Sequence, residues 1–176
     1  MPDSSEPRAV AVVDIDGVLA DVNHRLHYVA KRPKDWDAFF AAASKDPLLP
    51  EGLAVARELA ERYDLTYLSG RPERCRRDTE QWFVANGIPP GELLLRRPND
   101  RRPARITKVE ILKRIAATRR IALLVDDDFE VCSAARSAGF TVLEATWGKP
   151  SNAQDDSGQI RLFDALAEAQ EHDGRT

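Results

Sequence analysis

Short apolar runs recur along the chain, and more polar segments separate them. The first run, over residues 9–15, is almost continuously apolar and ends in carboxylates. A strand that is hydrophobic at successive positions is typical of a parallel sheet covered on both faces. Similar runs predict further strands over residues 65–68, 93–95, 121–125 and 141–145.

Between these runs the apolar positions follow helical spacing. In residues 53–62 they form one stripe, as expected for a helix with a single buried face. Thr107 and Glu110 have the spacing of a capping box, which predicts a helix that begins at Thr107. The full pattern predicts helices over residues 53–62, 73–86, from 107 onward, over 129–137, and a small one near 162–169.

Strands and helices in alternation predict an α/β fold. We expect a three-layer, Rossmann-like, doubly wound parallel sheet of about five strands. The polar, aromatic-rich residues 21–50 interrupt the alternation and predict a small cap insertion after the first strand. The expected organisation is a disordered leader (1–8), a core (9–147) and a polar tail (148–176).

Composition places the chain among ordinary globular proteins. Of its 176 residues, 43% are hydrophobic and 31% are charged. No apolar run approaches the roughly 20 residues of a membrane span, and the polar start lacks the apolar stretch of a signal peptide. Cys75 and Cys132 have no metal-type spacing, so two free thiols and a cytoplasmic location are expected.

Positive charge is concentrated in the middle of the chain. The net charge is −3, yet residues 71–120 contain 14 Lys or Arg against 6 Asp or Glu. Such a balance has two interpretations that the sequence leaves open. It is either an electrostatic footprint for an anionic substrate or a set of solvated helix faces.

Two predicted strands end in carboxylates. Asp14 and Asp16 follow the first strand, and Asp126 to Asp128 follow the strand over residues 121–125. Buried carboxylates are costly unless a cation compensates them, and oxygen-only ligands favour Mg²⁺. Alone, Asp16 followed by Gly17 is also compatible with a simple turn, and the run from Asp126 to Asp128 with a solvated loop. Because ligands bind at the carboxyl ends of neighbouring parallel strands, the coincidence of both favours a metal site.

A phosphate-binding set is predicted beside these carboxylates. Ser69 and Gly70 follow the second strand, where a hydroxyl and an approachable backbone N–H form a cradle for an anion. Arg71 adds a bidentate fork for phosphate. Lys108, in the first turn of its predicted helix, opposes the helix dipole, and nearby carboxylates and a phosphate would compensate it.

These motifs, in this order, resemble those of the haloacid dehalogenase superfamily. The resemblance covers roughly residues 10–147 and implies a phosphatase with Asp14 as nucleophile and Asp16 as general acid and base. It implies that Mg²⁺ is held by Asp14, the Asp16 carbonyl and Asp127, with Asp126 in support. It also implies that Ser69 and Lys108 hold the phosphoryl oxygens, with Lys108 offsetting the charge of the nucleophile.

Within the superfamily, the chain resembles the 3′-phosphatase domain of phage polynucleotide kinase–phosphatase. The shared features are the Ser-Gly-Arg motif, the arginines before Lys108, the Asp126-Asp127 pair and the small cap. The resemblance implies a nucleic-acid or nucleotide 3′-phosphate as substrate, with Arg71 on its phosphate. The sequence has no GxxxxGK[ST] loop, so a kinase or ligase partner is expected to be separate.

Other functions remain open at this point. One alternative is a phosphatase of a small metabolite or nucleoside monophosphate, and another is a non-catalytic phosphate-binding module. Trp36, Phe39 and Phe40 either stack on a base or form the core of the cap. His24 and His27 have no third ligand at useful spacing, which favours simple polar contacts over a zinc site.

Overall fold

The computed structural model describes residues 7–149 and has a parallel sheet at its centre. The strands are β1 (Val10–Val13), β2 (Asp64–Pro72), β3 (Gly91–Arg96), β4 (Ile121–Asp126) and β5 (Val142–Glu144). They lie in the order β3-β2-β1-β4-β5, and every neighbouring pair is parallel. The direction of winding reverses between β1 and β4, where sheets of this type bind their ligands. The α/β fold predicted from the sequence is confirmed.

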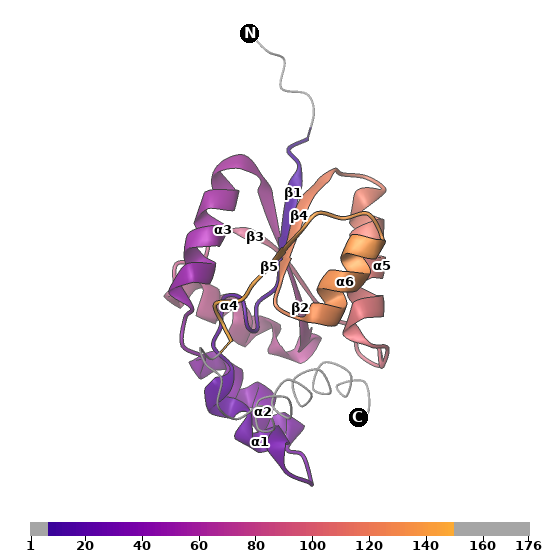
Figure 1. The fold of residues 1–176 in the computed structure, drawn as a ribbon. Coiled ribbons are helices and arrows are strands. Elements are labelled where there is room, and N and C mark those ends of the chain that lie inside the picture. The colour runs from indigo at the N-terminus through magenta and orange to yellow at the C-terminus, as the bar shows by residue number, and fades with distance from the viewer. Residues whose placement is uncertain (1–6, 150–176) are drawn as a thin grey trace.

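Helices cover both faces of the sheet and complete three layers (Figure 1). On one face lie α3 (Pro50–Arg62) and α4 (Arg76–Ala85), and on the other lie α5 (Ala104–Ala116) and α6 (Phe129–Ser137). The helix predicted near residues 162–169, with the tail from 150, lies outside the described residues, as do residues 1–6 of the predicted leader.

The strand β1 is buried on both sides. Ala11 and Val13 pack in the cluster beneath α3 and α4, whereas Val10 and Val12 pack in the cluster beneath α5 and α6. Each of these side chains is at most 1% exposed. Burial of one such valine contributes about 1.5–3 kcal/mol. This packing fixes the register of β1, and with it the position of Asp14.

Residues 21–50, called the cap segment below, leave the sheet after β1 and return at α3. They contain η1 (Asn23–Arg25), α1 (His27–Ala30), α2 (Trp36–Ala41) and η2 (Ala42–Lys45). In Figure 1 the helices α1 and α2 lie below the carboxyl ends of the strands. Phe39 and Phe40 are buried in a cluster with Val29, against which Trp36 packs. The cap aromatics therefore form a small core of their own.

Two element boundaries differ from the sequence prediction beside the acidic strand ends. β2 continues through Pro72, so Ser69 and Gly70 lie in extended backbone, and the 3₁₀ helix η3 (Glu73–Cys75) precedes α4. The helix α5 begins at Ala104 rather than at Thr107, and the predicted capping box does not form. Proline suits the start of a helix because its φ is already helical, and Pro103 has φ −52°.

Candidate active site

The two acidic strand ends meet at the centre of the sheet edge. β1 pairs with β4, with Val13 opposite Val125, so Asp14 lies beside Asp126 and Asp127. One oxygen from each of these carboxylates lies within 4.8 Å of the others. All three residues are buried. The juxtaposition expected from the sequence is therefore present, at the point where the strand order reverses.

Lys108 reaches this carboxylate group from α5. Its Nζ atom lies 2.8 Å from Asp14 Oδ2 and 2.7 Å from Asp126 Oδ2, and the residue is only 2% exposed. Burial alone would lower the pKa of Lys108, but Asp126 and Asp14 outweigh it and raise the pKa. The ammonium group is thus held in its charged form, in the second turn of α5 rather than in the first turn as predicted.

The pKa of the Asp14 carboxyl group lies near neutral pH. Burial raises its pKa most, Lys108 opposes that effect, and Asp126 adds to it, which brings the pKa to about 7. Its Oδ1 accepts a hydrogen bond from the backbone N–H of Ile15 at 2.7 Å. A further cation beside Asp14 would favour its ionised form.

The donor set fits a hard divalent cation. Asp127 Oδ1 is buried and has no hydrogen-bond partner among the described residues. Burial raises the pKa of Asp127 well above its usual value, and Asp126 and Asp14 raise it further. Gly17, with φ +78°, leaves room for this carboxylate, since a Cβ at that position would lie 2.1 Å from Asp127 Oδ2. Clustered carboxylate oxygens of this kind are typical Mg²⁺ ligands.

Asp16 belongs to a second charged group beside the first. Arg71 donates to Asp16 Oδ1 from Nε at 3.0 Å and from Nη2 at 2.6 Å. Arg25, from the cap segment, donates to the same oxygen at 2.9 Å. Burial alone would raise the pKa of Asp16, but Arg71 and Arg25 outweigh it and hold the pKa below its usual range. In the described part of the chain Oδ2 accepts no hydrogen bond, so this oxygen is available to a ligand.

Asp46 completes the second group and ties the cap segment to the core. Its carboxylate accepts from Arg25 Nε and Nη2, both at 2.8 Å, and from Arg71 Nη2 at 2.8 Å. His24 Nε2 lies 2.7 Å from Asp46 Oδ1, and the indole of Trp82 donates to the Asp46 carbonyl at 2.8 Å. The residues Asp16, Arg25, Asp46 and Arg71 are called the cap network below.

The Ser-Gly-Arg motif lies at the carboxyl end of β2, next to β1. Ser69 Oγ accepts the backbone N–H of Arg71 at 3.2 Å, which leaves the hydroxyl proton of Ser69 free to donate. Ser69, Gly70 and Lys108, the residues predicted to bind phosphate, line one pocket. Arg71, predicted to contact phosphate, is 1% exposed, and its guanidinium donates to Asp16 and Asp46.

Comparison with known proteins identifies the family. The profile of the family described as "Polynucleotide kinase PNKP phosphatase domain" matches residues 7–149. The chain belongs to this family. It is accordingly a phosphatase of the haloacid dehalogenase superfamily, a hydrolase that acts on phosphate monoesters. Among curated proteins, none matches the chain.

Solved structures place this PNKP-type phosphatase in the same fold. It is similar to a chain in the structure of a Pnkp1/Rnl/Hen1 complex, with 29% identity and a TM-score of 0.66. That match covers 81% of this phosphatase and 47% of the other chain, so the phosphatase spans about half of its relative. The haloacid dehalogenase-like protein SP0104 from Streptococcus pneumoniae, at 14% identity, has a TM-score of 0.56 over 92% of each chain.

A further neighbour was solved with a metal. YfnB from Bacillus subtilis, described as a putative HAD-hydrolase bound to magnesium, has a TM-score of 0.53 at 10% identity. The match covers 78% of this phosphatase and 88% of YfnB, and it shows a shared fold. Within residues 7–149 the phosphatase has no helix with the length and hydropathy of a membrane span.

Sequence reasoning did not assign Arg25 and Asp46 to the site. They lie 21 positions apart within the cap segment, and neither follows a predicted strand. Arg25 is 0% exposed and Asp46 is 4% exposed, which is rare for charged residues unless they are paired. No local signal separates them from the other charged residues of the polar cap segment, most of which are exposed.

Proposed function

We propose that this PNKP-type phosphatase is Mg²⁺-dependent and removes the 3′-phosphate from nucleic-acid or nucleotide ends through an aspartyl-phosphate on Asp14. The observation that carries the proposal is that the carboxylates of Asp14 and Asp16 lie in different electrostatic surroundings. Asp14 lies against Lys108 among the strand-end carboxylates, whereas Asp16 lies against Arg25 and Arg71 with one oxygen open. Two carboxylates in unlike surroundings suit a nucleophile and an acid–base group.

Asp14 acts as the nucleophile in this proposal. One of its carboxylate oxygens attacks phosphorus, and the bond between phosphorus and the leaving oxygen breaks. Lys108 stabilises the ionised nucleophile and, with Ser69 O–H and the Gly70 backbone, the charge on the phosphoryl oxygens. Asp14, Asp127 and the Asp16 carbonyl, supported by Asp126, would hold the Mg²⁺ ion, which would supply further charge neutralisation.

Asp16 Oδ2 transfers the protons. It first gives a proton to the leaving oxygen, and then takes one from the water that attacks the phosphorus of the acyl phosphate. That second attack releases inorganic phosphate and restores Asp14. Arg71 and Arg25 act as positioning residues, since they fix Oδ1 and lower the pKa of Asp16. An approaching phosphate dianion raises that pKa again, because a like charge disfavours the carboxylate.

The proposal of a nucleic-acid substrate and of a kinase or ligase partner is supported by the family match and by the positive charge of residues 71–120. The family is described as the phosphatase domain of a polynucleotide kinase, and residues 71–120 carry the excess of basic side chains. The similar Pnkp1 chain was solved with Rnl and Hen1 in what is described as an RNA repair complex. A kinase or ligase partner, which would use the 3′-hydroxyl left by this phosphatase, fits that likeness, and the reducing cytoplasm is the expected location.

The test is phosphate release from a panel of esters, with Mg²⁺ and with EDTA. The panel holds a 3′-phosphorylated oligonucleotide, nucleoside monophosphates and sugar phosphates. We expect Mg²⁺-dependent release chiefly from the oligonucleotide, loss of release in Asp14→Asn, and about 100-fold slower release in Lys108→Met. Trapping of ³²P on the unaltered protein but not on Asp14→Asn would identify the acyl phosphate.

The other outcomes separate the parts of the proposal. Release chiefly from a sugar phosphate would keep the mechanism and remove the nucleic-acid substrate. Phosphate release that is equally fast with Mg²⁺ and with EDTA would contradict the proposed Mg²⁺ dependence. A folded protein that releases phosphate from no ester, yet binds inorganic phosphate, would make the chain a binding module.

A further inference from the structure

The helix α4 presents two buried hydrogen-bonding side chains to the cap network. Its buried residues are Thr79 and Trp82, which are 1% and 4% exposed, while the rest of the helix is half-buried or exposed. Residues three positions apart lie on the same face of a helix. Such a buried face is usually apolar, and a hydroxyl group that lies in it needs a hydrogen-bond partner. The partners of these two side chains therefore indicate what this face of α4 supports.

Thr79 contacts the guanidinium group of Arg71. Nη1 of Arg71 donates to Thr79 Oγ1 at 3.2 Å. Nε and Nη2 of the same group donate to Asp16 Oδ1, and Nη2 also donates to Asp46. All three nitrogens of the guanidinium are thus engaged. Thr79 accepts from the one nitrogen that no carboxylate of the described residues engages.

A neutral acceptor suits this position. The guanidinium of Arg71 is planar and rigid, so a partner for Nη1 fixes the plane in which Nε and Nη2 meet Asp16. A carboxylate in place of Thr79 would compete with Asp16 for the positive charge of Arg71. A valine would remove the described partner of a buried donor, which is unfavourable. A hydroxyl group orients the guanidinium without neutralising it.

Trp82 ties the same face of α4 to the end of the cap segment. Its indole Nε1 donates to the Asp46 carbonyl at 2.8 Å, and its ring packs in the cluster beneath α3 and α4. The carboxylate of Asp46 accepts from both Arg25 and Arg71. One face of α4 therefore holds the backbone of Asp46, and it also holds the guanidinium of Arg71.

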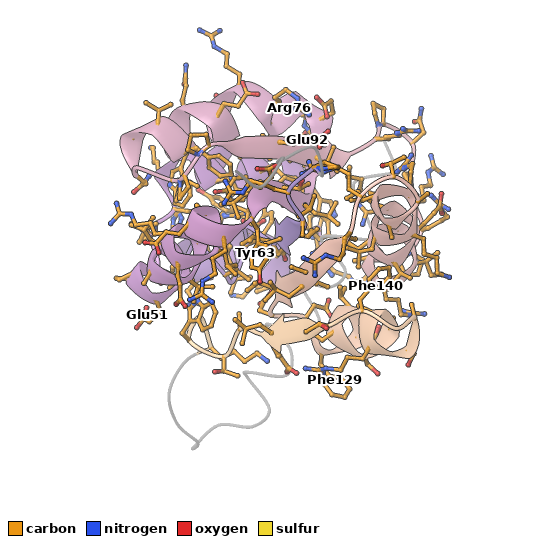
Figure 2. The ribbon with its side chains drawn as sticks, turned by 90° about the horizontal axis from the view of Figure 1, so that it is seen from above. Glu51, Tyr63, Arg76, Glu92, Phe129 and Phe140 are labelled. Carbon is orange, nitrogen blue, oxygen red and sulfur yellow. The ribbon has the colours of Figure 1, made fainter. Side chains whose placement is uncertain are left out.

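The helix α4 is itself fixed to the sheet and to the cap segment. Arg76, its first residue, donates from Nη2 to the Leu93 carbonyl of β3 at 3.1 Å. Figure 2 shows Arg76 close to Glu92 at this edge of the sheet. On the side of the cap, α4 packs against η2. A helix held in this way is a rigid support for side chains that must keep their orientation.

We infer that Thr79 is a positioning residue for proton transfer by Asp16. Its hydroxyl group fixes the guanidinium of Arg71, and the guanidinium fixes the Asp16 carboxyl group with Oδ2 open to the leaving oxygen. The inference rests on the proposed function of Asp16 and adds a residue of α4 to the groups that control it. Thr79 acts only through Arg71.

Leaving groups of different basicity report on this proton transfer. An alkoxide, such as the 3′-oxygen of a nucleoside, must be protonated as it leaves, whereas p-nitrophenolate is a weak base and leaves without a proton. The ratio kcat/KM reports the steps up to the loss of the leaving group. A defect in proton donation therefore lowers kcat/KM more for an alkyl ester than for p-nitrophenyl phosphate. A general structural defect lowers both alike.

The test compares Thr79→Ser, Thr79→Ala and Thr79→Val on a 3′-phosphorylated oligonucleotide and on p-nitrophenyl phosphate. Serine keeps the hydroxyl group, and alanine differs from serine only by its absence. We expect Thr79→Ala and Thr79→Val to lower kcat/KM about tenfold for the oligonucleotide and less than about threefold for p-nitrophenyl phosphate. Thr79→Ser should stay within about twofold of the unaltered protein on both substrates, because the hydrogen bond is kept.

Two reference variants complete the experiment. Asp16→Asn removes the proton donor and should lower kcat/KM far more for the oligonucleotide than for p-nitrophenyl phosphate. Thr66→Val is the matched control, because Thr66 on β2 is also buried, at 4% exposed. Within residues 7–149, none of the hydrogen bonds of the cap network involves it. It should leave kcat/KM for both substrates near that of the unaltered protein. The melting temperature of each variant is measured alongside.

The outcomes separate failure of the inference from failure of the proposed function. Equal kcat/KM for Thr79→Ser and Thr79→Ala on the oligonucleotide would overturn the role of Thr79, while discrimination by Asp16→Asn would leave the function standing. Equal losses on both substrates in Thr79→Ala, with a lowered melting temperature, would assign Thr79 to folding alone. Equal losses on both substrates in Asp16→Asn would overturn the proton-transfer role of Asp16 and the inference with it.

A wrong substrate does not affect this test. If the oligonucleotide is not hydrolysed, the sugar phosphate that is hydrolysed fastest serves as the alkyl ester. A folded protein that hydrolyses no ester at all would overturn the proposed function and the role of Thr79 together.

Discussion

At the scale of residues, the unusual feature of Asp16 is that all its described side-chain hydrogen bonds fall on one oxygen. Arg25 and Arg71 both donate to Oδ1, which fixes the plane of the carboxyl group and leaves Oδ2 open. A lone carboxylate in such a buried position would hold its proton, because burial favours the neutral form. The two guanidinium groups reverse that preference. They thereby set both the direction and the acidity of the proposed proton donor.

Arg25→Ala tests whether the cap network sets the acidity of Asp16. Loss of this guanidinium should raise the pKa of Asp16, because one of the charges that lower it is removed. We expect kcat/KM to fall roughly 10- to 100-fold, as is usual for the loss of a residue that orients a reactive group. The limb of the pH–rate profile that reports Asp16 should move to higher pH.

Arg25→Lys is the matched control for that experiment. Lysine keeps the charge but cannot bridge Asp16 and both oxygens of Asp46. We therefore expect kcat/KM to fall, while the pH–rate profile shifts less than in Arg25→Ala. A rate loss that is uniform across the pH range in Arg25→Ala would contradict the assignment and leave Arg25 a purely structural role.

At the scale of elements, the loop after β1 packs closely against the end of β4 and the start of α3. Gly17 faces Asp127, and a Cβ at Gly52 in the first turn of α3 would lie 1.8 Å from the Val18 carbonyl oxygen. Both glycines permit close approach, but to different groups. One approach involves a carboxylate of the proposed metal site, and the other involves backbone alone.

Gly17→Ala and Gly52→Ala should consequently have separable effects. Each should lower the free energy of unfolding by about 1–3 kcal/mol, because each Cβ overlaps neighbouring atoms. Gly17→Ala should also displace Asp127 and weaken Mg²⁺ binding at least about tenfold, whereas Gly52→Ala should leave Mg²⁺ affinity near that of the unaltered protein. The measurement is the Mg²⁺ dependence of the melting temperature. An equal loss of Mg²⁺ affinity in both variants would show that the loop moves as a unit.

The sequence predicted most of the sheet and the acidic strand ends because both signals are local. The run before Asp14 and the run before Asp126 are apolar throughout, and a parallel sheet brings their ends to one edge. The capping-box pattern predicts that α5 begins at Thr107, whereas the helix begins at Ala104, directly after Pro103. Proline competes well at that point because it needs no capping partner for its missing N–H.

Other parts of the site depend on contacts between distant segments. Arg71 was expected on phosphate, because a guanidinium after Ser-Gly suggests an anion. Its observed partner Asp46 lies 25 positions earlier in the cap segment, and no local pattern pairs them. The pocket lined by Leu94 of β3 and Ile111 of α5 likewise depends on how two helices are distributed over five strands. Such features follow from tertiary packing, and the linear pattern of apolar positions does not encode them.

At the scale of the whole molecule, the strand-end carboxylates link stability to pH and to metal. Asp14 has a pKa of about 7 against a usual 3.8, and burial raises the pKa of Asp126 and of Asp127 as well. A carboxyl group with a raised pKa binds its proton more tightly in the folded state. Its contribution to stability is therefore greatest below about pH 4 and is lost as the pH rises through the folded-state value.

In EDTA, the melting temperature should consequently fall between pH 5 and pH 8. The free energy of unfolding should fall by on the order of 3 kcal/mol, which lowers the melting temperature of a domain of this size by roughly 5–10 °C. Mg²⁺ should restore most of it at pH 8 and little at pH 5, because the ligands must be deprotonated to bind. Asp16 acts in the opposite sense, but its lowered pKa confines its effect to more acidic solution.

Asp127→Asn is the control for this whole-molecule effect. It removes one of the carboxyl groups that oppose ionisation, so the melting temperature in EDTA should depend less on pH and respond less to Mg²⁺. A melting temperature that rises from pH 5 to pH 8 in EDTA would contradict the link between these carboxylates and stability.

The cap network also bears on how a protein of this kind can diversify. Arg25 and Asp46 belong to the cap segment, yet they hold the proposed acid–base residue and the β2 arginine. A cap exchanged for that of another enzyme, or recombined at its borders, would remove part of the proton-transfer apparatus together with the old cap. The cap is therefore expected to be inherited as an inseparable part of the catalyst.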